Sequence, residues 1–358
     1  YVLGGRAMMI VYDDEEMAEY FALHVGKQKL EHPVLIDKFL ENAIEVDVDA
    51  LSDGEDVYVA GVMEHIEEAG IHSGDSSCVL PPYSLPAETV AEIERQTVAL
   101  AKELRVVGLM NIQFAVKDGV VFILEVNPRA SRTAPFVSKA TGVPLPRLAT
   151  QVMLGKTLKE LDPWSMRRSG YVSVKESVFP FRRFPGVDIL LGPEMRSTGE
   201  VMGIAPTFEE AFLKGQWGAG QKLPEGGKVF LSVNDRDKRF VAEVARQYVD
   251  LGFELLATSG TAGLLAGQGI PSTRVLKVYE GRPNIVDLIK NGEVSLVINT
   301  ASGKRTAHDS KAIRQATLHY GVPYSTTLSG AKAIARAIGA ARTTEVRVKS
   351  LQEYYKGE

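Results

Sequence analysis

Three polar side chains near the end of a predicted β-hairpin have the types and spacing of a divalent cation site. Two apolar runs, Met110–Val116 and Val120–Val126, flank Lys117-Asp118-Gly119, and their β-branched residues predict two antiparallel strands joined by a short turn. Glu125 and Asn127 lie two residues apart, so they point to the same face of the second strand. Hard oxygen ligands on one face suit Mg²⁺, which completes its shell with water and phosphate oxygens.

Gln113 joins this face only in one register of the hairpin. A two-residue Asp-Gly loop pairs residue 113 with residue 124 and turns Gln113 away from Glu125, whereas a three-residue loop pairs 113 with 123 and puts the three side chains together. The metal hypothesis therefore predicts the three-residue loop, and in this interpretation a two-residue turn contradicts it. The alternative is a solvated strand end without a ligand.

The polar residues of this hairpin also occur in a known pattern. Gln113, Glu125 and Asn127, followed by Pro128 and Arg129, resemble the metal-binding segment of ATP-grasp ligases, and LEVNPRASRTAPFVSKATGVPL resembles the large subunit of carbamoyl phosphate synthase. The resemblance covers essentially the whole chain. It implies phosphorylation of carbamate by ATP, with Mg²⁺ or Mn²⁺ on Gln113, Glu125 and Asn127, K⁺ as a further cation, and Arg129 as a catalytic phosphoryl clamp.

The resemblance also implies a nucleotide site on the elements that precede the hairpin. Pro33–Phe39 is predicted to be a buried strand, and Ile44–Leu51 a strand whose Glu45, Asp47 and Asp49 share one face that is wet or liganded. Glycines, serines and a Pro-Pro pair predict a long loop from Glu64 to Leu85. By resemblance the ATP contacts are Lys38, Leu40, Glu45, Gly70, Ile71, His72, Ser73, Gln113 and Glu125.

The last third of the chain alternates strands and helices, which predicts a parallel sheet with helices on both faces. The predicted strands are Val229–Val233, Glu254–Ala257, Arg274–Val278, Val294–Asn299 and Val322–Thr326. Ligands of such folds bind at the carboxyl ends of the strands. Hydroxyls, amides and lysines there favour an anion site over simple helix capping, although capping is the common role of a Thr-Ser-Gly-Thr stretch.

This second unit resembles the methylglyoxal synthase-like domain of the same family. The aspartates of the catalytic synthase are missing from the matching segments Gly281–Asn284 and Asn299–Ser302, so catalysis is excluded and allosteric binding of a UMP-type or IMP-type nucleotide is implied. The resemblance also implies an ornithine pocket, in which Ser325 replaces an aspartate. The implied nucleotide residues are Lys238, Thr258, Thr261, Lys277 and Asn299, and the implied ornithine residues are Glu67, Asp75, Glu176, Tyr324 and Thr326.

Composition and length limit the remaining possibilities. The 358 residues predict a partial ATP-grasp domain at 1–155, a connector at 156–222 and the methylglyoxal synthase-like domain at 223–358. A net charge of −4 argues against nucleic acid, and the single Cys78 together with the lack of a long apolar run or a signal peptide predicts a cytoplasmic protein without a membrane partner.

The expected partners are the amino-terminal part of the same large chain and a glutaminase small subunit. We therefore expect a fragment that is inactive alone and belongs to an enzyme of pyrimidine and arginine biosynthesis. Two alternatives remain, which are another ATP-grasp ligase, such as a biotin carboxylase, and a nucleotide-binding regulatory module without catalysis.

Overall fold

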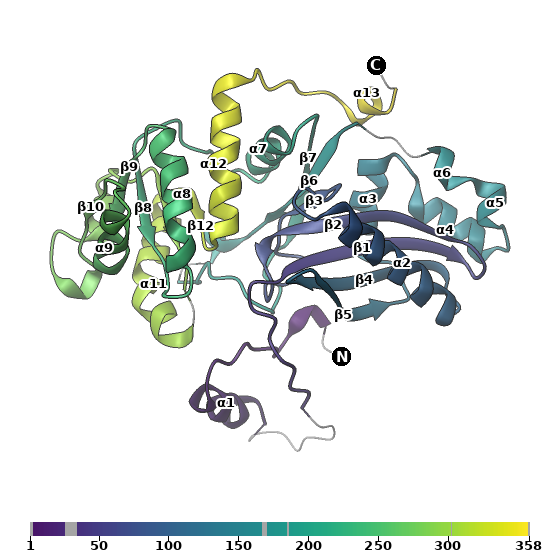
Figure 1. Cartoon of the computed structure of the whole chain (residues 1–358), viewed down its shortest axis with the longest axis horizontal. Coiled ribbons are helices and arrows are strands. Elements are labelled where there is room, and N and C mark those ends of the chain that lie inside the picture. Colours follow the sequence, from purple (N-terminus) through teal and green to yellow (C-terminus); the bar gives the residue numbers. More distant parts are fainter. Residues whose placement is uncertain (1–2, 26–33, 167–169, 185, 302, 357–358) are drawn as a thin grey trace.

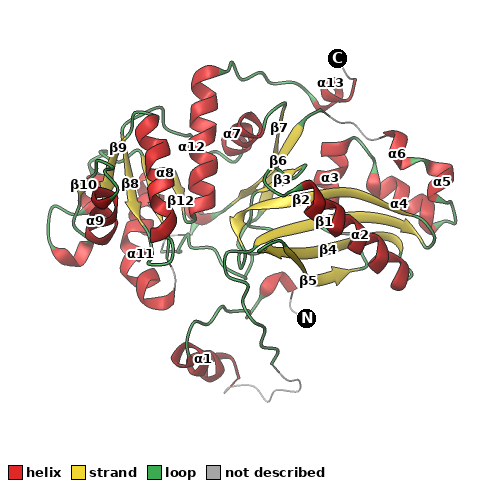
Figure 2. Ribbon diagram, in the orientation of Figure 1, coloured by secondary structure: helices red, strands yellow, loops and turns green. Residues whose placement is uncertain are grey.

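The fold contains two β-sheets of different kinds, each covered by helices (Figures 1 and 2). The computed structural model describes residues 3–25, 34–166, 170–184, 186–301 and 303–356. The first sheet has seven antiparallel strands in the order β5-β4-β1-β2-β3-β6-β7, and the second has five parallel strands in the order β10-β9-β8-β11-β12.

The first sheet buries one face beneath α2 and the other beneath α3 and α4. Val46, Val48 and Ala50 of β1 pack with Ile93 of α2, whereas Leu51 lies in the cluster on the opposite face. This alternation is the period of two expected for a strand buried on both sides. The strands are β1 Ile44–Asp53, β2 Val57–Glu68, β3 Cys78–Leu80, β4 Val107–Lys117, β5 Val120–Asn127, β6 Val172–Val178 and β7 Gly199–Ala205; the helices are α2 Ala87–Glu103, α3 Ala134–Thr141, α4 Leu145–Met153, α5 Leu158–Leu161 and α6 Pro163–Met166.

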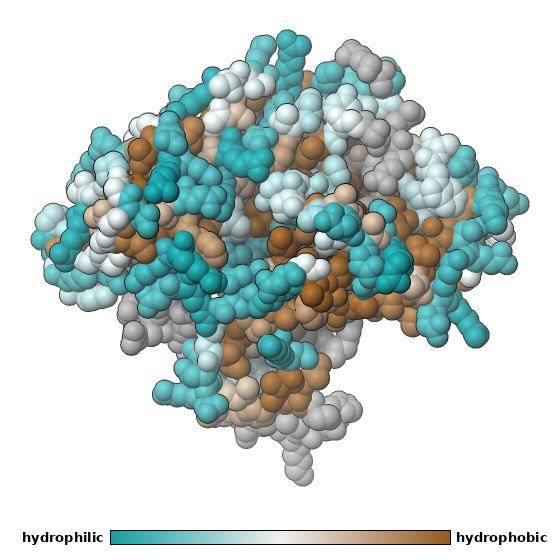
Figure 3. Space-filling model, viewed as in Figure 1, coloured by the Kyte–Doolittle hydropathy of each residue, from teal (hydrophilic) through white to brown (hydrophobic). Residues whose placement is uncertain are grey.

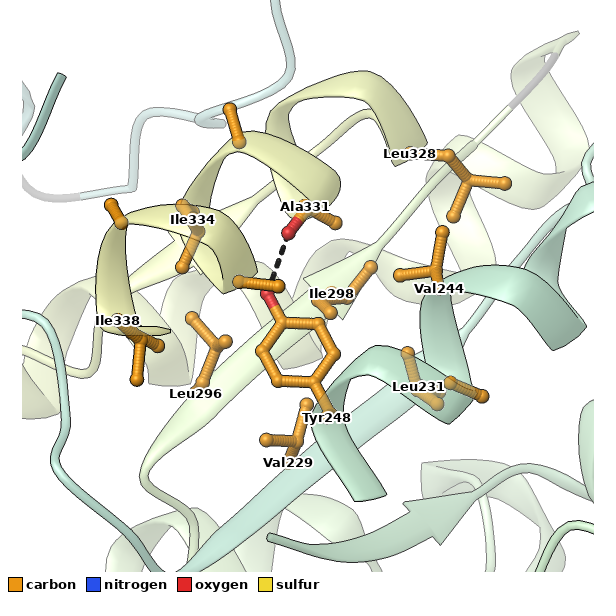
Figure 4. Packing of buried hydrophobic residues seen from close by; sticks show 14 of the residues in the cluster. Val229, Leu231, Val244, Tyr248, Leu296, Ile298, Leu328, Ala331, Ile334 and Ile338 are labelled. Carbon is orange, nitrogen blue, oxygen red and sulfur yellow. Dashed lines mark hydrogen bonds between the residues drawn. The ribbon is translucent and has the colours of Figure 1, made fainter. Parts of the chain in front are cut away.

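The predicted parallel sheet of the second unit is confirmed. Its apolar side chains alternate between a cluster that contains α8 and α12 and a cluster that contains α10 and α11. In Figure 4, the buried Tyr248 of α8 donates its hydroxyl to the carbonyl of Ala331 in α12 at 2.7 Å. The elements are β8 Lys228–Ser232, α8 Lys238–Asp250, β9 Glu254–Ala257, α9 Ser259–Gly267, β10 Thr273–Arg274, α10 Ile285–Lys290, β11 Leu296–Asn299, α11 Gly303–Tyr320, β12 Tyr324–Ser325 and α12 Leu328–Thr343, with α13 Leu351–Lys356 near the end.

The two units share a hydrophobic core. Helix α7 (Phe208–Gly218) packs on β6 and β7, and the same buried cluster continues from Phe208 and Phe212 into α12 and α8. Arg336 of α12 lies 4.8 Å from the ring of Phe208 and pairs with Glu209. The segment expected as a connector, residues 156–222, thus contributes strands β6 and β7 to the first sheet. It also contributes helix α7, against which the second unit packs.

Three expectations for the first half are wrong. The described part of Pro33–Phe39, residues 34–39, is not a strand, and Leu35 is 82% exposed, because the segment pairs with no sheet. The apolar spacing within Asp13–Val25 predicts a helix that packs on a sheet, but helix α1 (Asp14–Tyr20) buries none of its residues and stands away from both sheets in Figure 1. The loop from Glu64 to Leu85 is shorter than expected, because β2 extends to Glu68 and β3 interrupts the loop.

Candidate functional site

The hairpin of β4 and β5 has a two-residue turn, so the predicted three-residue loop is wrong. Lys117 pairs with Val120, and the turn residues Asp118 and Gly119 have φ values of 51° and 77°. Two consecutive positive φ values define the type I′ geometry that matches the twist of antiparallel strands, and an Asp-Gly pair favours it.

A β-bulge corrects the register that this turn alone would impose. Phe114 pairs with Ile123, whereas Gln113 pairs with Glu125, so Leu124 is an extra residue without a partner opposite it. Gln113 and Glu125 therefore face the same side, although the pairing of residues 113 and 123 that we expected is not formed. The same-face arrangement of the three candidate ligands is confirmed, and the bulge rather than the turn produces it.

The contacts of Gln113 and Glu125 leave oxygen atoms available, whereas Asn127 Oδ1 accepts a hydrogen bond from Arg129. Gln113 donates from Nε2 to Ser73 Oγ at 3.1 Å, so its Oε1 remains as an acceptor. Asn127 donates from Nδ2 to Glu125 Oε1 at 2.8 Å. One carboxylate and two amide oxygens fit a hard cation that takes its other ligands from water and phosphate. Within the described ranges, no cluster of three or more His, Cys, Asp or Glu side chains forms a metal site by protein ligands alone.

Arg129 lies beside this group at the open end of the site. It is exposed, and its guanidinium donates to Asn127 Oδ1 and to the carbonyl of Ala130, both at 3.1 Å. The alternative role of Arg129, an ion pair with a neighbouring carboxylate, is not formed among the residues described here. The planar fork is thus oriented toward the metal-binding face and suits a phosphoryl group.

Two aspartates on the same face of the sheet were not recognised as site residues from the sequence. Asp49 is 1% exposed and accepts hydrogen bonds from Ser131 Oγ and Thr133 Oγ1, both at 2.6 Å, and from Asn111 Nδ2 at 3.2 Å. Burial raises the pKa of Asp49 to about 6, although the two hydroxyl donors oppose the increase. Asp49 therefore anchors the segment that carries Arg129.

Asp47 forms the other buried ionic contact on this face, with His65. Its carboxylate lies 2.9 Å from His65 Nε2. Burial alone would raise the pKa of Asp47, but the hydrogen bond and charge of His65, together with Lys175 and Asn111, outweigh burial, so the pKa is lowered. The face of β1 is therefore buried and paired rather than wet. The sequence contained one signal for this polar cluster, which is the alternation of polar residues on β4. Asn111 lies opposite Asp49, and Gln113 lies opposite Asp47.

The structure brings the predicted nucleotide loop to the same face. Glu45 Oε1 accepts from the backbone N–H of Gly70 at 3.0 Å, and Ser73 contacts Gln113. The buried Lys175 donates from Nζ to the carbonyl of Ser73 at 2.9 Å. His72 is half-buried, and burial together with Arg132 lowers its pKa.

The remaining nucleotide candidates lie on or near this loop without a side-chain contact to the metal-binding face. Lys38 is exposed in the extended segment whose neighbour Phe39 lies against Gly70. Leu40 accepts a hydrogen bond from the N–H of Ala43, and Ile71 is partly buried.

At the second sheet, four predicted anion-binding residues lie at the carboxyl ends of adjacent strands. Thr258 Oγ1 donates to Ser232 Oγ at 3.4 Å, and Asn299 Nδ2 donates to the carbonyl of Ser232 at 3.2 Å. Thr261 Oγ1 accepts from the N–H of Val233 at 3.5 Å. Lys238 is close to Gly260, because a Cβ added there would lie 3.3 Å from its Nζ.

A buried hydroxyl at this edge supports a ligand site. Ser259, the first residue of α9, has a buried Oγ without a hydrogen-bond partner in the described structure. The start of a helix with an unpartnered donor beside a lysine is an arrangement that binds phosphate. The fifth predicted residue, Lys277, has its ammonium 5.7 Å from the centroid of the Tyr279 ring.

The predicted ornithine residues divide into two groups. Ser77 joins Glu67 and Glu176, donating its N–H to Glu67 at 2.6 Å and its hydroxyl to Glu176 at 2.6 Å. Burial and the charge of Glu67 raise the pKa of Glu176 to about 8. Burial and the charge of Glu176 raise the pKa of Tyr324 as well, which places Tyr324 near this pair.

The other two predicted ornithine residues, Asp75 and Thr326, have surroundings different from those of Glu67 and Glu176. The carboxylate of Asp75 accepts the backbone N–H groups of Arg196 and Ser197 at 2.8 Å each, so it holds backbone. Thr326 is partly buried on the segment between β12 and α12.

Comparison with known families assigns two regions of the chain. The family model for the ATP-binding domain of the carbamoyl-phosphate synthase L chain matches residues 1–161, and the model for the MGS-like domain matches residues 241–326. No described helix is both long and apolar enough to span a bilayer.

Curated relatives match nearly the whole chain. The carbamoyl phosphate synthase large chains of Gemmatimonas aurantiaca and Archaeoglobus fulgidus are each 55% identical over 99% of this chain, which spans 32% and 33% of their lengths. The protein described as the carbamoyl phosphate synthase large chain, C-terminal section, of Methanocaldococcus jannaschii is 52% identical over 99% of this chain and 59% of its own length. A solved biotin carboxylase domain of a single-chain bacterial carboxylase is 15% identical, with a TM-score of 0.44 over 58% of this chain and 52% of that one.

Proposed function

Because this chain carries the ATP-binding domain of carbamoyl-phosphate synthase large chains followed by an MGS-like domain, we propose that it is the carboxy-terminal part of such a large chain and phosphorylates carbamate with ATP. The observation that carries the proposal is the bulge that places Gln113 and Glu125 on one face, with Asn127 and Arg129 beside them. In the reaction, a carbamate oxygen forms a bond to the γ-phosphorus while the bond to ADP breaks.

Each residue of the face has a role that its contacts support. A divalent cation, when bound, neutralises phosphate charge and aligns the oxygens for transfer. Glu125 is the anionic ligand for it, and Gln113 and Asn127 supply amide oxygens. Arg129, whose guanidinium here donates to the carbonyl of Ala130 and to Asn127 Oδ1, turns N–H groups toward the transferred phosphoryl group, where its positive charge stabilises the transition state. Glu45 holds the ribose of ATP, and the loop 70–73 contacts the rest of the nucleotide.

The second sheet is proposed to bind a nucleotide monophosphate that regulates the enzyme. The support is the group formed by Lys238, Thr258 and Thr261 with the unpartnered Ser259 hydroxyl, because hydroxyls and amides at a helix start bind phosphate oxygens. Glu67 and Glu176, which are joined by Ser77, would bind a cationic amino acid such as ornithine through their carboxylates. Asn284 lies in a segment that lacks the aspartate of the catalytic synthase. It caps the start of α10, where its side-chain oxygen accepts the N–H of Val286 at 3.0 Å. This capping role requires no catalytic aspartate.

The partner proposed for the first sheet is the remaining part of the large chain. Strand β5 is an edge strand, and its Val120, Phe122, Ile123 and Leu124 are between 38% and 54% exposed. Apolar residues gather over this side of the first sheet in Figure 3. Long apolar edges are usually covered in folded proteins. The cover proposed here is the part of the large chain that the relatives possess in addition, and the glutaminase subunit is the further partner.

The test uses the full-length enzyme with Glu125→Gln, which removes the anionic ligand and keeps the size of the side chain. The two assays are bicarbonate-dependent ATP hydrolysis and ATP synthesis from ADP and carbamoyl phosphate. We expect synthesis to fall by ~100-fold, as for other single groups that stabilise a transition state, while bicarbonate-dependent hydrolysis persists. Glu254→Gln, an exposed glutamate at the start of β9, is the matched control. Survival of both activities in Glu125→Gln would contradict the assignment.

A further inference from the structure

Arg314 of α11 is a buried arginine that contacts both units of the fold. Its side chain is 1% exposed, and its Nε and Nη2 donate to the two oxygens of Asp188, each at 2.6 Å. Its Nη1 donates to Asn299 Oδ1 at 3.2 Å. Asp188 belongs to the chain between β6 and β7 of the first sheet, and Asn299 ends β11 of the second. One guanidinium therefore joins the predicted effector site to the first unit.

The segment that carries Asp188 continues to the nucleotide loop of the first sheet. Four residues after Asp188, the carbonyl of Gly192 accepts the N–H of His72 at 2.9 Å. Further along, Ser197 donates its hydroxyl to the carbonyl of Gly74 at 2.7 Å, and its N–H to Asp75 at 2.8 Å. Residues 188–197 are thus held at one end by Arg314 and at the other by the loop that contains residues 70–75.

The same loop touches the candidate catalytic face. Ser73 accepts from Gln113 Nε2, and the N–H of Gly70 donates to Glu45. A path of direct contacts and covalent chain therefore leads from Asn299 to the candidate metal ligand Gln113. It passes through Arg314, Asp188, Gly192 and His72. Contiguity alone does not establish energetic coupling, which requires an element that both sites bias.

Asn299 is such an element, because both the Nδ2 and the Oδ1 of its side-chain amide already form hydrogen bonds. It is 1% exposed, its Nδ2 donates to the carbonyl of Ser232, and its Oδ1 accepts from Arg314. A nucleotide that hydrogen-bonds to Asn299 must replace or reorient one of these bonds. A change at Oδ1 acts directly on Arg314, whose buried charge is strongly tied to Asp188, since breaking a buried ion pair costs several kcal/mol.

In the other described ion pairs that join the two units, the arginine is much more exposed than Arg314, whereas Asp188 is itself 27% exposed. Arg336 and Glu209 have side chains 43% and 28% exposed, and Arg236 and Glu41 are 44% and 42% exposed. Pairs with such exposed arginines contribute little to stability and are screened by salt. They are therefore suited to holding the units together rather than to transmitting a specific change.

We propose that the Arg314–Asp188 ion pair is the link through which a nucleotide at Asn299 changes the position of residues 188–197 and of the loop 70–75 that serves the ATP site. Arg314 and Asp188 are positioning residues in this account and touch no substrate. The inference rests on the proposed nucleotide site of the second sheet. By linkage, ATP at the first site must change the affinity for the nucleotide by the same factor.

The experiment uses the full-length enzyme with its glutaminase subunit and the variant Asp188→Asn, with UMP and IMP as probes. Three quantities are measured: ATP turnover without nucleotide, nucleotide affinity by calorimetry, and the factor by which saturating nucleotide changes KM for ATP. We expect turnover and nucleotide affinity to stay within about threefold of wild type. We expect the coupling factor, typically about 5–150 in allosteric proteins, to fall below about two.

Two further variants separate the possible causes. Glu209→Gln, which removes an exposed pair between the same units, should retain the wild-type coupling factor. Ser197→Ala leaves the ion pair intact but removes the hydroxyl bond to Gly74 at the far end, and should reduce coupling even if Asp188→Asn fails to fold. An unchanged coupling factor in Asp188→Asn, or in Ser197→Ala where only that variant folds, would overturn the link alone. Absence of UMP and IMP binding to wild type would instead overturn the nucleotide site on which the link depends.

Discussion

Glu176 predicts an unusual dependence of stability on pH. It is buried beside Glu67, and burial with that neighbouring charge raises its pKa from 4.5 to about 8. Between these two values the folded chain holds a proton on Glu176 that the unfolded chain has released. The unfolded state then binds fewer protons, so the free energy of unfolding falls as the pH rises through this window.

The size of the effect follows from the two pKa values. Each pH unit between them is worth about 1.4 kcal/mol, which gives about 5 kcal/mol over the whole window. About 3 kcal/mol of that is lost between about pH 6 and about pH 9, where most globular proteins remain folded. Glu176→Gln is the right perturbation, because glutamine has the size of the protonated glutamate and does not titrate.

Urea unfolding of wild type and Glu176→Gln at the two pH values measures the effect. We expect the free energy of unfolding of wild type to fall by about 3 kcal/mol more than that of the variant over this interval. Groups that titrate in both proteins cancel in the comparison. Glu254→Gln, which removes an exposed carboxylate, should follow wild type. Parallel pH profiles for wild type and Glu176→Gln would refute the reasoning, because Glu176 would then be ionised throughout.

Three other substitutions test the packing around the two sites. Thr133→Val removes a 2.6 Å donor to Asp49 and should cost about 1–3 kcal/mol at pH 8, measured by urea unfolding, and less at pH 5, where the carboxyl is protonated; a loss independent of pH would contradict this. Gly203→Ala places a Cβ 1.9 Å from a carbonyl oxygen of α7 and should lower thermal stability by more than about 3 kcal/mol, whereas Gly199→Ala on the same strand meets nothing within 4 Å and should be nearly neutral. Tyr248→Phe removes the buried hydrogen bond to α12 and should cost about 1 kcal/mol in calorimetric unfolding, and an unchanged stability would show that this bond contributes nothing.

Local patterns in the sequence were sufficient for most elements of the second unit, although the predicted strands Arg274–Val278 and Val322–Thr326 are only the two-residue strands β10 and β12. The alternation of strands and helices predicted the parallel sheet, and β9 was predicted with its observed ends, Glu254 and Ala257. The loop length of the β4–β5 hairpin and the pairing of Gln113 were not predicted, but the existence of the hairpin was predicted from apolar runs around an Asp-Gly pair. These features depend on side-chain periodicity and turn chemistry, both of which are local.

The tertiary structure decided the features that depend on neighbours distant in sequence. The bulge at Leu124 sets which face Glu125 shares with Gln113, and a pattern of two residues per repeat cannot reveal an inserted residue. Asp49 acts as an anchor because Asn111 of β4 and the hydroxyls of Ser131 and Thr133, which are distant from it in sequence, donate hydrogen bonds to it. The pairing of Arg314 with Asp188 joins residues 126 positions apart, and no local periodicity relates them. The sequence by itself therefore determined which elements form and which polar residues they carry, whereas burial, register and the contacts between the units follow from long-range packing.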